Sequence, residues 1–135
     1  MVRPAPLQLF SVAPITVARI EGKDVLMIHP EGRVHVPLLP GATSVTASFG
    51  ILPDAYEAGS TDGVEFLIEL LDESHEQILL DRHLDPRRQL GDRGTQRFFA
   101  SLPAHSPGEI VFSVLPGPAR DMSRDWSYWS SILVQ

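Results

Sequence analysis

Residues 64–71 read VEFLIELL, and this stretch decides between a helical and a β fold. Its apolar side chains at positions 64, 66, 68 and 70 alternate as in a strand, but those at 64, 67, 68 and 71 also fit helical spacing. Gly63 precedes the stretch, and the turn-like residues 72–75 (DESH) follow it. A second apolar run extends from Gln77 to Leu84. We therefore predict that the two runs form a β-hairpin.

Alternation with a period of two recurs on both sides of this hairpin. Arg33–Leu38 places Val34, Val36 and Leu38 on one face, and Ser44–Ile51 alternates in the same way. Four further runs complete the strand candidates: Asp24–His29, Thr95–Leu102, Glu109–Leu115 and Trp126–Val134. About eight short strands with little helix predict an all-β fold, an antiparallel β-sandwich or barrel.

The rest of the chain adds few regular elements. The single helical turn that the sequence favours is Pro53–Ala58, which begins with proline and is followed by Gly59. Residues 1–14 contain three prolines and are predicted to form an extended N-terminal arm. Because 135 residues fit one domain, we assign residues 15–135 to a single β-sandwich domain.

Composition limits the classes of partner. The chain has 11 Lys and Arg against 17 Asp and Glu, and this acidic balance argues against a nucleic-acid surface or an anionic membrane. It has no cysteine, which excludes disulfides, thiolate metal sites and a cysteine nucleophile. The sequence shows no apolar run long enough to span a membrane and no secretion signal at its start. The compartment stays open.

The sequence shows no familiar catalytic motif. It has no HExxH zinc motif, no GxSxG nucleophile elbow and no glycine-rich phosphate loop. His29 and His35 share a strand face if their segments are continuous, but they are too far apart to hold one metal ion. Carboxylates are plentiful, yet the sequence brings no two of them to the separation that glycoside hydrolysis needs. We therefore predict a protein that is not an enzyme.

Residues 82–93 (RHLDPRRQLGDR) mix arginine with aspartate. The favoured interpretation is a connection held in place by Arg–Asp pairs, because the planar guanidinium matches a carboxylate. The alternative is a polar rim that binds hydroxyls or an anionic group.

Asp125–Trp129 (DWSYW) gathers both tryptophans of the chain. On a strand, Trp126 and Tyr128 lie on one face and Trp129 on the other. We expect Trp129 to be buried. Trp126 or Tyr128 would then lie near a loop edge, where an aromatic ring suits the apolar face of a sugar. Packing of Trp126 inside the sandwich is the open alternative.

Three segments in this order resemble carbohydrate-binding modules of the NPCBM type: Ser48-Phe49-Gly50-Ile51, Asp62-Gly63-Val64-Glu65-Phe66, and Asp125 with Trp129. The resemblance covers roughly residues 44–135. It implies a galactose-binding-like jelly roll that recognises sugar without catalysis, belonging to or assisting a bacterial glycan-handling protein. Some such domains hold a structural calcium ion, but this sequence has no dense acidic run that identifies a calcium site.

Together, the residues and the resemblance predict a sugar site at the loop end of the sandwich. We expect Trp126 or Tyr128 to stack on the sugar. Hydrogen bonds would come from these four residues: Asp125, Arg87, Arg88 and Asp54. The alternative function is a structural or protein-interaction domain, in a larger protein or a homo-oligomer, because interfaces also favour aromatic residues and arginine.

Overall fold

The computed structural model describes residues 8–11, 16–20, 23–28, 32–52, 63–73, 76–116 and 127–135. These residues form ten strands and one short 3₁₀ turn, and no helix among them is long and apolar enough to cross a membrane. The elements are β1 (Gln8–Ser11), β2 (Thr16–Ile20), β3 (Lys23–Ile28), β4 (Gly32–Leu38), β5 (Ser44–Ile51), β6 (Val64–Asp72), β7 (Glu76–Leu84), η1 (Leu90–Asp92), β8 (Gln96–Ser101), β9 (Gly108–Pro116) and β10 (Ser127–Val134).

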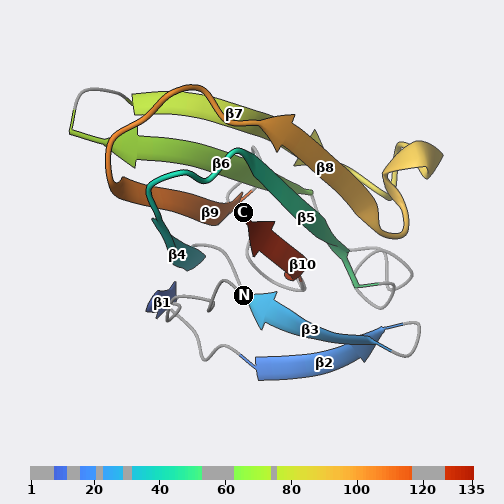
Figure 1. Ribbon diagram of the computed structural model, residues 1–135. Helices are drawn as coiled ribbons and strands as arrows, with labels where there is room; N and C mark the ends of the chain where they lie inside the picture. The colour runs from blue at the N-terminus through green and yellow to red at the C-terminus, as the bar shows by residue number, and fades with distance from the viewer. Residues whose placement is uncertain are drawn as a thin grey trace.

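The strands form two five-stranded antiparallel sheets, which confirms the predicted all-β sandwich (Figure 1). Sheet A has the order β1-β4-β9-β6-β7, and sheet B has the order β2-β3-β10-β5-β8. Only the β2–β3 and β6–β7 pairs join strands that are consecutive along the chain. Every other pair of consecutive strands lies in different sheets, so most pairings hold together segments that are distant in sequence.

The predicted hairpin at residues 64–84 is confirmed. β6 pairs with β7 on one side and with β9 on the other, so it lies inside sheet A. Four apolar side chains of β6 are almost completely buried: Val64, Phe66, Ile68 and Leu70. The strand pattern prevails over the helical one because a strand between two neighbours directs every second side chain into the core.

The two strands that the sequence analysis did not predict are both edge strands. β1 lies within the predicted N-terminal arm and pairs with β4, and β2 pairs with β3. They escaped prediction because they are only four and five residues long, too short to show a clear alternation. The predicted helical turn at Pro53–Ala58 lies outside the described residues.

Trp129 lies at the centre of the core, as predicted, and its side chain is fully buried. Its ring centroid is 5.3 Å from that of Phe49 in sheet B. On sheet A, it is 5.5 Å from that of Phe66 and 5.3 Å from that of Phe112. Offset and edge-on contacts of this kind contribute roughly 0.5–1.5 kcal/mol each beyond the burial of apolar area. One side chain therefore joins the two sheets.

Tyr128 lies on the opposite face of β10 from Trp129, as strand alternation requires. It pairs with Gly50 on β5, and a Cβ atom at Gly50 would lie only 2.5 Å from the Tyr128 Oη and 2.9 Å from the Gly94 carbonyl oxygen. The phenol ring therefore covers the glycine, and the absence of a side chain at position 50 is what allows this packing.

Replacing Gly50 with alanine should consequently destabilise the protein by about 1–3 kcal/mol, because the added methyl group clashes with a buried ring and a backbone carbonyl. Gly91→Ala is the matched control, since a Cβ atom there meets nothing within 4 Å. Chemical denaturation of both variants measures the difference. Equal stability of the two variants would show that Tyr128 does not pack against Gly50.

Candidate functional site

The predicted ligand-binding residues are only partly within the described structure. Asp54, Asp125 and Trp126 lie outside the described residues, so their roles stay predictions. Arg87 and Arg88 are exposed on the connection between β7 and β8. Tyr128 is described in full and is buried.

Ion pairs and hydrogen bonds hold the β7–β8 connection in place. Arg82 Nη2 lies 3.2 Å from Asp92 Oδ1, and the other carboxylate oxygen of Asp92 accepts a hydrogen bond from the Asp85 backbone N–H at 2.9 Å. Arg93 Nε donates to the carbonyl oxygen of Pro86 at 2.7 Å. Arg88 lies 3.6 Å from Asp85 and is largely exposed. The favoured interpretation of this segment, a connection held by Arg–Asp pairs, is confirmed.

The stacking role predicted for Tyr128 does not fit its environment. Its side chain is only 2% exposed, and its ring lies over Gly50. Its hydroxyl is 2.8 Å from Thr95 Oγ1, within hydrogen-bond distance. Because the ring already packs against protein, it presents no free face to a sugar, and the prediction of stacking by Tyr128 is wrong.

Glu65 and Asp81 form a carboxyl pair on the outer face of sheet A. The pKa of Glu65 is raised from 4.5 to about 7, mainly by a hydrogen bond with the Asp81 side chain and to a smaller extent by burial and by the charge of Asp81. Retaining glycosidases need their two carboxyl groups roughly 5 Å apart, and inverting enzymes need more. Two carboxyl groups in direct hydrogen bond leave no room for a sugar between them. The pair therefore does not have the spacing of a glycosidase site.

Metal-ligating side chains do not gather in the described part of the chain. It contains no group of three or more His, Asp or Glu side chains that could hold a metal ion. His35 lies 3.1 Å from Glu109 across the β4–β9 pair.

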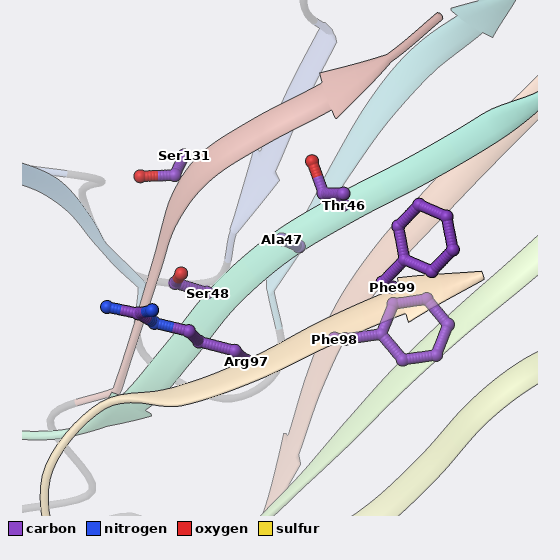
Figure 2. Close-up of a pocket in the computed structure, with 7 residues that line it drawn as sticks. All are labelled: Thr46, Ala47, Ser48, Arg97, Phe98, Phe99 and Ser131. Carbon is purple, nitrogen blue, oxygen red and sulfur yellow. The ribbon is translucent and has the colours of Figure 1, made fainter.

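The outer face of sheet B carries a shallow hollow of about 330 Å³. Seven residues line it: Thr46, Ala47, Ser48, Arg97, Phe98, Phe99 and Ser131 (Figure 2). They come from the three neighbouring strands β5, β8 and β10. The volume is at the lower end of the range for small-molecule sites in proteins.

Strand register explains why these side chains gather there. Across sheet B, Ser48 pairs with both Ser130 and Arg97, and the next outward position, Thr46, pairs with both Leu133 and Phe99. We call the outward-facing set the platform and define it as Thr46, Ser48, Arg97, Phe99, Ser131 and Leu133. Figure 2 shows Arg97, Ser48 and Ser131 toward one end of the hollow, and Thr46 and Phe99 toward the other.

A β-bulge in β10 shapes the hollow. The register between β10 and β5 shifts between Ser130 and Leu133, and Ser131 has a φ of 51°. A serine in this left-handed region costs of order 1–3 kcal/mol, and such strain is concentrated at functional sites. The extra residue lets Ser131 face outward beside the platform, while Trp129 stays in the core.

The platform combines an open aromatic ring with unused polar groups. Phe99 is 66% exposed. Within the described ranges, no hydrogen bond or ion pair engages the guanidinium of Arg97 or the hydroxyls of Thr46, Ser48 and Ser131. An apolar ring face beside free donors and acceptors matches the chemistry of a sugar ring, which has C–H faces and hydroxyl edges.

The sequence analysis missed this platform. Its only local signal is the alternation of residues 95–102, which sends Arg97 and Phe99 to the same face of β8. That face could not be recognised as a site without knowing that β8 pairs with β5, which begins more than 40 residues earlier, and that the bulge in β10 lies beside them.

The Glu65–Asp81 pair predicts a pH-dependent stability. Because the pKa of Glu65 is raised to about 7 in the folded protein, the folded state holds a proton that the unfolded state releases between about pH 4.5 and 7. The stabilisation is therefore complete below this window and is lost as the pH rises through it. Glu65→Gln keeps a hydrogen-bond donor for Asp81 and cannot ionise. We expect this variant to be more stable than the wild type at pH 8, by an amount of order 1 kcal/mol after screening by water.

Thermal unfolding from pH 4.5 to 8.5 tests this expectation. Glu69→Gln, which makes the same substitution on the same face of β6, is the matched control. The comparison uses the difference in stability between variant and wild type at each pH. A Glu65→Gln variant with an unchanged slope would contradict the carboxyl pair.

No family model matches the chain. An uncharacterized protein of Archaeoglobus fulgidus is 29% identical over 93 residues, which is 67% of this chain and 23% of that protein. The match thus spans about a quarter of the length of that relative.

Two solved structures share the fold. CBM51 from Clostridium perfringens GH95, solved in complex with methyl-galactose, has 13% identity and a TM-score of 0.59, covering 99% of this chain and 95% of that chain. The CBM22-1 xylan-binding domain from Paenibacillus barcinonensis has 10% identity and a TM-score of 0.57, covering 96% and 84%. At these identities the likeness concerns the fold alone. The fold of this chain is that of β-sandwich carbohydrate-binding modules, as the resemblance in the sequence implied.

Proposed function

We propose that this protein is a non-catalytic carbohydrate-binding module whose ligand lies on the platform of sheet B. The observation that carries the proposal is the exposed ring of Phe99 beside a hollow with three hydroxyls and one guanidinium that have no hydrogen-bond or ion-pair partner among the described residues. The similar solved structures support it, because one is described with methyl-galactose and the other as xylan-binding.

Stacking on Phe99 would supply much of the binding free energy. Covering one face of the ring removes about 60 Å² of apolar surface from water, which is worth roughly 1.5 kcal/mol or about tenfold in affinity. The hydroxyls of Thr46, Ser48 and Ser131 would then replace their hydrogen bonds to water with hydrogen bonds to the sugar hydroxyls. Because the net gain of such a replacement is small, these hydroxyls would orient the sugar more than they would raise its affinity. A single site of this kind binds at about micromolar to millimolar Kd.

Weak binding is useful when the module is linked to another domain. The Archaeoglobus fulgidus relative is about four times as long as the matched segment. We propose that this chain acts in a larger glycan-handling protein, where tethering raises the effective ligand concentration.

The loop end of the sandwich remains a second proposed contact region. Arg87 and Arg88 are exposed there, and Asp54, Asp125 and Trp126 are the other residues that we propose to contact the ligand at this end. A ligand longer than one sugar unit would reach from the platform toward this end. Tyr128 lies between the two regions, because it is on the same face of sheet B as the platform and its hydroxyl is next to Thr95 at the end of the β7–β8 connection.

A protein-interaction domain is the second candidate function. Two large apolar side chains favour it: Ile78 is 59% exposed on the edge strand β7, and Leu90 is 74% exposed in η1. Edge strands and exposed apolar side chains are features through which chains associate.

Phe99→Ala should weaken binding of any glycan identified on an array by about tenfold or more, because the variant loses the stacking face. Ile78→Ala is the matched control, since Ile78 is similarly exposed but lies on sheet A. Titration calorimetry of both variants, with unfolding temperatures measured alongside, gives the comparison.

Trp126→Ala separates the two proposed contact regions. Loss of binding in Trp126→Ala with full binding in Phe99→Ala would move the site from the platform to the loop end. A folded protein that binds no glycan and forms a stable dimer in light scattering would instead favour the protein-interaction domain.

A further inference from the structure

We infer that the platform selects an acidic saccharide, a hexose that carries a carboxylate or a sulfate ester, and that Arg97 binds the anionic group. This inference rests on the proposed function and adds the class of ligand. Arg97 is the only ionisable side chain among the residues that line the hollow. Its permanent positive charge makes its hydrogen bonds to an anionic group stronger than those to a neutral hydroxyl.

The state of Arg97 differs from that of three other arginines nearby in sequence. Arg82 pairs with Asp92, Arg88 pairs with Asp85, and Arg93 donates to a backbone carbonyl, so each serves the β7–β8 connection. Arg97 is exposed, and among the described residues it has neither a carboxylate nor a hydrogen-bond acceptor as partner. Its five N–H donors are therefore available for a planar anion.

Among the residues that the structure describes, the neighbours of Arg97 across sheet B carry no charge. In the strand register, Arg97 lies opposite Ser48 on β5, and Ser48 lies opposite Ser130 on β10. The following outward positions hold Thr46, Leu133 and Phe99, which are also neutral. The whole chain carries a formal charge of −6, but at physiological salt charges more than about 8 Å away are largely screened. The local guanidinium therefore determines the sign of the charge that the hollow attracts.

The platform also offers the sugar ring a contact surface, the Phe99 ring, on the same strand face as Arg97. Arg97 and Phe99 are two residues apart on β8, so their Cα atoms are about 6.8 Å apart along one face. Figure 2 shows the guanidinium extending along Ser48, away from the Phe99 ring. A saccharide stacked on Phe99 would extend toward this end of the hollow and place its anionic group at Arg97, beside the hydroxyls of Ser48 and Ser131.

The test uses matched pairs of probes that differ in one group. Methyl galactoside, methyl galacturonide and methyl galactoside 6-sulfate, and the corresponding glucosides, are titrated against the wild type and followed by NMR. The variants are Arg97→Gln, Arg97→Lys and Phe99→Ala, each with its unfolding temperature checked. Sodium sulfate at equal concentration is the control for binding of an anion without a sugar.

We expect the wild type to bind at least one acidic probe about tenfold more tightly than its neutral counterpart at 150 mM salt. Arg97→Gln should remove this preference, so that the variant binds the acidic and the neutral probe with equal affinity within about twofold. Arg97→Lys should keep part of the preference, because it retains the charge but loses the planar fork. Phe99→Ala should weaken both kinds of probe, and the two acidic probes show which anion fits better.

The outcomes separate the inference from the proposed function. Equal affinity of the wild type for acidic and neutral probes overturns the inference, while sugar binding that depends on Phe99 still supports the function. A preference that persists in Arg97→Gln also overturns it. Binding of sodium sulfate as tight as that of the acidic probes overturns it too, because the sugar would then contribute nothing. If no saccharide of either kind binds, both proposals are wrong.

Discussion

The contact of Trp129 with three phenylalanines is the interaction on which the rest of this structure depends. Phe49 belongs to sheet B, whereas Phe66 and Phe112 belong to sheet A, so the indole ring holds the two layers together. Its Nε1 has no hydrogen-bond partner among the described residues, so its position depends on apolar packing. A ring this large has one place in the core, and it fixes which face of β10 points inward.

Fixing that face determines the chemistry on the outside of sheet B. With Trp129 inward, Tyr128 must point outward, where it covers Gly50 and contacts Thr95. Farther along β10, the alternation places Ser130 outward, and the bulge that follows it lets Ser131 face outward as well. Ser131 accordingly lines a hollow whose other side chains come from β5 and β8. The platform is thus a consequence of core packing combined with one irregularity in a strand.

Much of the fold could be predicted from the sequence, because alternation is local. The ranges expected for β5 and β6 agree with the structure to within one residue, and Trp129 is buried as expected. The candidate site could be predicted far less well. Aromatic residues drew attention to the segment around Tyr128, but its ring is used for packing, which depends on a glycine nearly 80 residues away. Phe99 gives no comparable signal, since a phenylalanine in a strand usually faces the core.

The most direct test of the central claim is a crystal structure of the protein with the glycan that it binds most tightly. The sandwich should be unchanged, and the sugar should lie on the outer face of sheet B, with one ring stacked on Phe99 and its polar groups within hydrogen-bond distance of Ser48, Ser131 and Arg97. A sugar bound only at the β7–β8 connection, with the platform empty, would contradict this account.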